Sequence, residues 1–162
     1  MASQSRGWFP ILLVVLVVFV ACKLVRQSSP ASRVGEKLPP VAVQYLPGSL
    51  PYVSGKPAVI EFWATWCPPC RESIPHLNAL FARSQGKLQI IGISNEDQAT
   101  ITAFRQRTKM DYSVASDPSN RLHQHFGVRG IPSAVLVDAA GVVKWTGHPM
   151  ELDDGKIAML LR

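Results

Sequence analysis

Two cysteines separated by two prolines directly follow a run of strand-forming residues, and this combination constrains the fold more than any other feature of the chain. The run spans residues 58–64 and is typical of a short buried strand. It leads into Trp66-Cys67-Pro68-Pro69-Cys70, after which apolar residues recur at helical spacing to about residue 84. A helix beginning at Cys67 places this thiol where the helix dipole and free N–H groups stabilise a thiolate. Because the thiolate is the attacking species in disulfide exchange, the motif predicts a redox-active dithiol.

The residues between and after the cysteines suit the start of a helix. Pro68 and Pro69 lack an N–H group, and their fixed φ fits an opening turn. They should also stiffen the ring that Cys67 and Cys70 would close. Pro75 lies further along the same helix and predicts a kink there.

Other uses of the cysteine pair are less well supported by the sequence. A structural zinc site needs four ligands, but Cys22 is the only further cysteine and the 4 histidines lack finger-like spacing. A purely structural disulfide that closes so short a loop stabilises a protein little. We therefore expect neither a bound metal nor a cofactor.

Strands and helices alternate over the rest of the chain. The hydrophobic patterns predict strands at 88–93, 134–137 and 142–146, the last two joined by a turn at 138–141, and helices at 99–107, 120–126 and 152–162. This alternation predicts an α/β sandwich with helices on both faces of a mixed central sheet.

The N-terminal part of the chain has a different character. Residues 8–22 are apolar and uncharged, which is typical of a signal sequence or a membrane anchor. With three more residues the stretch is just long enough to span a bilayer if Lys23 snorkels. The run also ends in a lipobox-like sequence at Cys22, which leaves a lipoprotein signal peptide as the alternative. We divide the chain into an anchor or signal segment at 1–25, a flexible linker at 26–35 and a redox domain at 36–162.

The formal net charge of +6 would suit a nucleic-acid partner if it lay on the globular domain. Four of the 17 basic residues and none of the 11 acidic residues precede residue 36, so the domain itself carries only +2. Most of the positive charge thus belongs to the membrane-proximal segment, and we expect no nucleic-acid partner.

Two motifs together resemble a known family. The first is the stretch from Glu61 through the cysteine pair to Arg71, followed by Pro75. The second is Phe126-Gly127-Val128-Arg129-Gly130-Ile131-Pro132, followed by a predicted strand. In this order they resemble the thioredoxin superfamily, most of all the membrane-tethered thiol–disulfide oxidoreductases of the TlpA/ResA/DsbE group. The resemblance implies a thioredoxin-like fold, with residues 95–124 resembling the insertion of TlpA-type members.

Site residues follow from the resemblance at the matching positions. Cys67 would be the nucleophile and Cys70 the resolving thiol. The peptide bond between Ile131 and Pro132 would be cis, presenting the Ile131 backbone to an extended substrate peptide. We assign the substrate groove to Trp66, Pro68, Pro69, Ile131 and Pro132, and no residue to a metal.

Glu61 stands where thioredoxins carry a buried acid beneath the active site. Such a carboxylate would have a raised pKa and could relay the proton of Cys70; the alternative is a strand-end glutamate that reaches solvent. Several relatives carry a glutamate three residues after the second cysteine, but this chain has Ser73 there, and Glu72 is rotated by about 100° on a helix. We transfer no role to Glu72. We expect His123 and His125, near the proline loop, to be surface residues.

The function implied is reduction of disulfides in exported proteins, such as apocytochrome c. A membrane electron donor of the DsbD/CcdA type would re-reduce the dithiol. The resemblance also places the chain at a bacterial inner membrane, with the catalytic domain facing the periplasm or cell exterior, although a count of positive residues alone favours the opposite orientation. The alternatives are a disulfide oxidase or isomerase on the same fold, whose direction depends on potential, and a copper-site assembly factor. A peroxidase would need a different motif around its cysteine.

Overall fold

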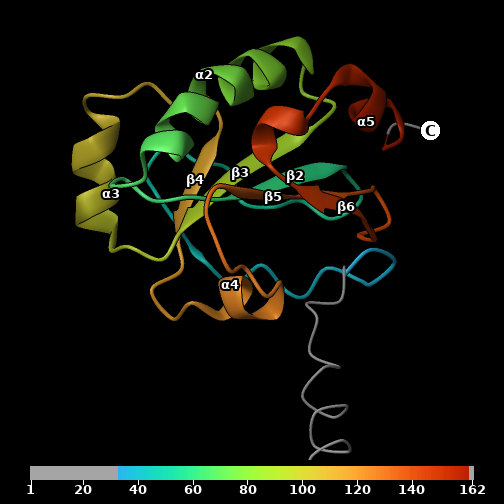
Figure 1. The fold of residues 1–162 in the computed structure, drawn as a ribbon, viewed down its shortest axis with the longest axis horizontal. Coiled ribbons are helices and arrows are strands. Elements are labelled where there is room, and N and C mark those ends of the chain that lie inside the picture. The colour runs from blue at the N-terminus through green and yellow to red at the C-terminus, as the bar shows by residue number, and fades with distance from the viewer. Residues whose placement is uncertain (1–32, 161–162) are drawn as a thin grey trace, which may run out of the picture. The chain divides into compact units, whose positions relative to one another are not determined.

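The computed structural model describes residues 33–160, which form the predicted α/β sandwich around one mixed sheet (Figure 1). The strands lie in the order β1-β4-β3-β2-β5-β6. Their bounds are β1 Gln44–Tyr45, β2 Ala58–Phe62, β3 Gln89–Ser94, β4 Ser113–Ser116, β5 Ser133–Val137 and β6 Val143–Gly147. The helices are α2 Pro68–Arg83, α3 Gln98–Arg105, α4 Arg121–His125, the 3₁₀ helix η1 Pro149–Glu151 and α5 Asp154–Ala158.

Strand β2 lies inside the sheet and determines where the site forms. It pairs in parallel with β3 and antiparallel with β5, so that Glu61 lies opposite Gly92 on one side and Ala134 on the other. All five residues of β2 are buried. The chain leaves this strand toward α2, so Cys67 follows the carboxyl end of β2, which runs parallel to β3; open α/β sheets place their sites at this end of the strands.

Helices cover both faces of the sheet, with α2 and α4 on opposite sides (Figure 1). The strand period of two divides β2 accordingly. Val59 contributes to the core that contains the apolar residues of α2, whereas Ile60 and Phe62 contribute to the second core, against α4. Glu61 shares the parity of Val59 and therefore lies on the α2 face.

Strands β1 and β4 and the C-terminal helix differ from the sequence prediction; β1 is only two residues long. Strand β4 was not predicted, because its four residues place a serine on each side of Val114 and Ala115 and carry no clear hydrophobic period. The helix predicted at 152–162 is present but shorter: α5 begins at Asp154, where the side chain of its N-cap Asp153 accepts a hydrogen bond from the Lys156 N–H, and it ends at Ala158. The short η1, capped by His148, precedes it and was not predicted.

The predicted anchor at 1–25 and most of the predicted linker at 26–35, Cys22 included, lie outside the described residues. Within residues 33–160, no helix combines the length and the apolar character needed to cross a membrane.

Candidate active site

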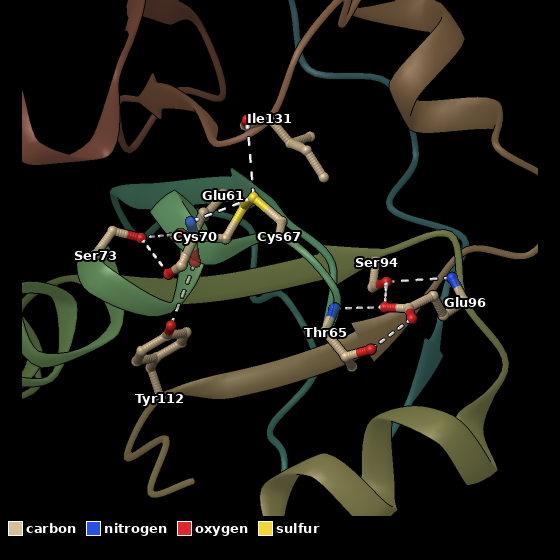
Figure 2. Close-up of a disulfide and its surroundings, with 9 residues drawn as sticks. All are labelled: Glu61, Thr65, Cys67, Cys70, Ser73, Ser94, Glu96, Tyr112 and Ile131. Atoms are coloured by element: carbon tan, nitrogen blue, oxygen red, sulfur yellow. Dashed lines mark hydrogen bonds between the residues drawn. A yellow bond between two sulfur atoms is a disulfide. The ribbon is translucent and has the colours of Figure 1, made fainter.

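The two cysteines lie at the N-terminus of α2 and form a disulfide with an S–S distance of 2.11 Å (Figure 2). Cys67 is the N-cap of the helix, with extended backbone, and its Sγ lies 3.2 Å from the backbone N–H of Cys70. Pro68 and Pro69 occupy the first helical positions and are exposed. The helix therefore begins at the first cysteine, as the sequence predicts, and a backbone N–H points at the sulfur where thiolate charge would develop.

The proline loop lies directly against the cysteine pair. The Ile131–Pro132 peptide bond is cis. The carbonyl oxygen of Ile131 lies 3.8 Å from the Sγ of Cys67, although the two residues are 64 positions apart. Ile131 and Pro132 are half-buried, so the backbone beside the reactive sulfur stays within reach of a second chain.

Trp66 and Trp63 differ sharply in their surroundings. The side chain of Trp66 is 68% exposed, next to Cys67, whereas Trp63 is buried against Phe104 with ring centroids 5.4 Å apart. A large exposed aromatic beside a reactive group is suited to contact with a partner. The predicted groove residues are thus brought around Cys67, and Trp63 belongs to the core.

Glu61 is fully buried beneath the cysteine pair rather than exposed at the strand end. Ser73 donates to one of its oxygens at 2.8 Å, and the Tyr112 hydroxyl donates to the other at 3.3 Å (Figure 2). Burial raises the pKa of Glu61 to about 7, and the two hydrogen bonds partly oppose that rise. A carboxyl group with such a pKa can exchange a proton near neutral pH.

The two partners of Glu61 were not predicted as site residues. Ser73 is buried one turn after Cys70 on α2 and also lies 2.8 Å from the Cys70 carbonyl oxygen. Tyr112 directly precedes β4, and burial together with the nearby Glu61 raises its pKa well above the usual value. The sequence signal available for Ser73 was that it replaces the glutamate that several relatives carry at this position. Tyr112 lies beside β4, a strand that the sequence did not reveal.

A second carboxylate holds the segment that leads into Cys67. Glu96 follows β3 and accepts hydrogen bonds from both the N–H and the hydroxyl of Thr65, each at 2.7 Å (Figure 2). Ser94 donates to the same carboxylate at 3.0 Å. The sequence signal available for this contact was the position of Glu96, an acid just after β3. Because β3 runs parallel to β2, the segments that follow the two strands lie at the same edge of the sheet.

The histidines near the proline loop do not all lie on the surface. The prediction that His123 is a surface residue is wrong: it is buried on α4, with its ring 4.7 Å from that of Phe62 and its Nδ1 4.0 Å from Asp117. Burial lowers the pKa of His123. The face of the short α4 that carries His123 packs onto the sheet. Hydrophobic spacing over only five residues could not reveal which face of the helix is buried. His125 is half-buried, and Glu72 is exposed.

Metal-ligating side chains do not gather elsewhere in the part of the chain that the structure describes. Among these residues, no group of three or more histidine, cysteine, aspartate or glutamate side chains has the arrangement needed to hold a metal ion.

The sequence matches the AhpC/TSA family over residues 34–146, which is more than half of the chain. It is 28% identical over 154 residues to the thiol-disulfide oxidoreductase ResA of Halalkalibacterium halodurans, covering 88% of this chain and 86% of that protein. It is 31% identical over 123 residues to the thiol:disulfide interchange protein HelX of Rhodobacter capsulatus, covering 70% and 67%.

Solved structures show the same fold. A Chlorobium tepidum protein assigned as thiol:disulfide interchange protein DsbE superposes with a TM-score of 0.66 at 26% identity, covering 79% of this chain and 96% of that one. A secreted Mycobacterium tuberculosis disulfide oxidoreductase homologous to E. coli DsbE gives 0.57 at 25% identity, covering 66% and 84%. The thioredoxin-like architecture predicted from the two motifs is thereby confirmed.

Proposed function

Since this chain belongs to the AhpC/TSA family and is a thioredoxin-like thiol–disulfide oxidoreductase of the ResA/DsbE/HelX type, we propose that it acts as a reductase of protein disulfides. The observation that carries the proposal is the Cys67–Cys70 pair at the start of α2, beside the Ile131 carbonyl. The sulfur that caps the helix receives a backbone N–H, which favours it as the thiolate of the reduced pair.

The reaction is two successive thiol–disulfide exchanges. The Cys67 thiolate attacks one sulfur of the substrate disulfide, the substrate S–S bond breaks, and a mixed disulfide and a substrate thiolate form. The Cys70 thiolate then attacks Cys67, which releases the second substrate thiolate and closes the Cys67–Cys70 disulfide. Two electrons pass from the dithiol to the substrate, so a separate donor must return the pair to its reduced form.

Glu61 would take the proton of Cys70 in the second step. Cys70 is fully buried, so its thiol cannot pass a proton directly to bulk water. Glu61 is the buried carboxyl group whose hydrogen-bond network reaches the Cys70 carbonyl through Ser73, and its pKa of about 7 suits a group that both accepts and releases a proton.

The substrate peptide would lie across the exposed rim of the site. Trp66 and the Pro68–Pro69 turn flank Cys67 on one side, and the backbone of Ile131 and Pro132 lies on the other. An extended peptide beside Ile131 could hydrogen-bond to its backbone while its cystine meets the Cys67 sulfur.

The direction of electron flow is tested by the reduction potential of the Cys67–Cys70 pair. Thioredoxin lies at about −270 mV and the strong oxidant DsbA at about −120 mV. We expect a value near −250 mV, measured by equilibration with glutathione or dithiothreitol. A value near −120 mV would overturn the assignment as a reductase in favour of an oxidase or isomerase.

We also propose that the chain is tethered to a bacterial inner membrane, faces the periplasm or cell exterior, reduces exported proteins and is re-reduced by a donor of the DsbD/CcdA type. Support comes from the uncharged apolar run at 8–22 and from the need for an electron source. Membrane fractionation with an activity reporter at Arg162 tests the topology, and Cys22→Ala separates a lipoprotein from a membrane anchor. A reporter active only in the cytoplasm would contradict the exported assignment.

A further inference from the structure

Ser73 makes two contacts that its single hydroxyl proton cannot serve at once. Its Oγ lies 2.8 Å from Oε1 of Glu61 and 2.8 Å from the carbonyl oxygen of Cys70 (Figure 2). Both neighbours are acceptors when Glu61 is ionised, and a serine hydroxyl has one donor and two acceptor lone pairs. Ser73, Glu61 and Cys70 are all buried, so water does not readily compensate the acceptor from which the Ser73 proton turns away.

A second proton enters this contact when Glu61 is protonated. Its carboxyl O–H can then donate to Ser73, which frees the Ser73 proton for the Cys70 carbonyl. The Tyr112 hydroxyl contacts the other oxygen, Oε2, at 3.3 Å and can donate to it in either state. The same heavy-atom positions therefore satisfy two proton arrangements, one for each charge state of Glu61.

We propose that Ser73 is a two-position proton switch: it donates to Glu61 when that carboxylate is ionised and to the Cys70 carbonyl when Glu61 is protonated. The first turn of α2, which carries both cysteines, thereby responds to the protonation state of Glu61. This inference rests on the proposed role of Glu61 as the proton acceptor for Cys70. Ser73 touches neither sulfur nor substrate in this network, so it is a positioning residue.

The switch couples the proton to the second exchange step. When the proton leaves the Cys70 thiol and arrives on Glu61, the Ser73 proton turns from Glu61 to the Cys70 carbonyl, and no further proton is gained or lost. Once Glu61 releases the proton, Ser73 turns back. Ser73 thus supplies one of the two hydrogen-bond donors to ionised Glu61, and its loss should make that carboxylate harder to ionise.

The other groups around Glu61 would not produce the same response. Across the sheet, the neighbouring strands present Gly92 and Ala134, which do not titrate. Tyr112 ionises far above neutral pH, and the charge of Arg105 on α3 acts on that tyrosine. The two cysteines do not titrate while they form the disulfide. In the oxidised chain, a titration near neutral pH at this position therefore reports Glu61.

The test follows two ¹³C NMR signals of the oxidised full chain as pH changes: the Glu61 carboxyl and the Cys70 carbonyl. We expect both to titrate with one midpoint, and the Cys70 signal to stop responding in Glu61→Gln. Ser73→Ala should raise the Glu61 midpoint by about one pH unit, the loss expected for a hydrogen bond to a charged group.

Ser84→Ala is the matched control. Ser84 donates to the carbonyl of Phe81, three residues before it, just as Ser73 can donate to the carbonyl of Cys70. Ser84 lies at the other end of α2, away from Glu61. This variant should leave the Glu61 midpoint unchanged. The wild-type measurement does not depend on whether any variant folds. If the Cys70 carbonyl signal does not titrate with Glu61 in the wild-type chain, the switch is wrong.

Failure of the switch is distinguishable from failure of the proposed proton transfer. If Glu61→Gln leaves the pH profile of disulfide reduction unchanged, Glu61 is not the proton acceptor. If Glu61→Gln alters that profile while Ser73→Ala leaves the Glu61 midpoint in place, Glu61 keeps its role and the switch is wrong.

Discussion

Glu96 binds Thr65 through both of its carboxylate oxygens, one accepting from the backbone N–H and the other from the hydroxyl, each at 2.7 Å. Thr65 lies two residues before Cys67, in the segment that joins β2 to α2. Ser116 on β4 donates to the Glu96 carbonyl at 2.6 Å, so the ends of three adjacent strands meet at this contact. The position of the reactive cysteine is therefore tied to the sheet as well as to its own helix.

Glu96→Ala should loosen that segment. Hydrogen bonds to a charged group contribute about 1.5–3 kcal/mol when buried, and this partly exposed site should lose about 1–2 kcal/mol of unfolding free energy in urea titrations. Displacement of Cys67 should lower kcat/KM by roughly tenfold. Glu72→Ala, which removes an exposed acid from α2, is the control and should change neither quantity. Equal behaviour of the two variants would show that the Thr65 contact does not position Cys67.

Cys70→Ala should accumulate a mixed disulfide. Cys67 can still attack a substrate, but the thiol that resolves the intermediate is missing. Non-reducing gel electrophoresis and mass spectrometry should detect substrates bound through Cys67, and reductant should release them. Cys67→Ala is the control and should trap nothing, because it removes the sulfur that caps α2 and lies beside the Ile131 carbonyl. Equal trapping by both variants would reverse the assigned roles.

Glu61→Gln should stabilise the protein at high pH. The pKa of Glu61 rises from an ordinary 4.5 to about 7 on folding, so the folded state holds the extra proton between these values and wild-type stability falls as pH rises through them. Above pH 7 the ionised carboxylate costs on the order of 3 kcal/mol, which glutamine avoids. Below pH 4.5 the two proteins should be equally stable. Chemical denaturation across this range measures the difference, and a gap independent of pH would contradict the raised pKa.

Trp66→Ala should weaken substrate binding without unfolding the protein. The side chain is 68% exposed, so its removal should change stability by less than about 0.5 kcal/mol. Loss of an aromatic contact should raise KM for a disulfide-containing protein by roughly threefold to tenfold. The rate with a small disulfide such as an aromatic thiol dimer should stay the same. An equal loss with both substrates would mean that Trp66 acts on the chemistry of Cys67 instead.

Local sequence was sufficient to predict the cysteine pair at the start of α2. A strand, two prolines and a helical pattern define the backbone around Cys67, because each depends on residues close along the chain. The main strands and α2 were predicted for the same reason. β4 was not, since four small residues in the pattern of Ser113–Ser116 become a strand only when β3 supplies their hydrogen bonds.

What surrounds the cysteines was decided by the tertiary structure. The partners of Glu61 lie 12 and 51 positions away, and the Ile131 carbonyl lies 64 positions from Cys67. Burial of Glu61 and of His123 likewise depends on which elements the sheet brings over them. The sequence by itself determined a reactive dithiol at a helix start, because dihedral preferences and spacing are local. The proposed proton path and substrate rim required the fold, because burial and hydrogen-bond partners are properties of neighbours in space.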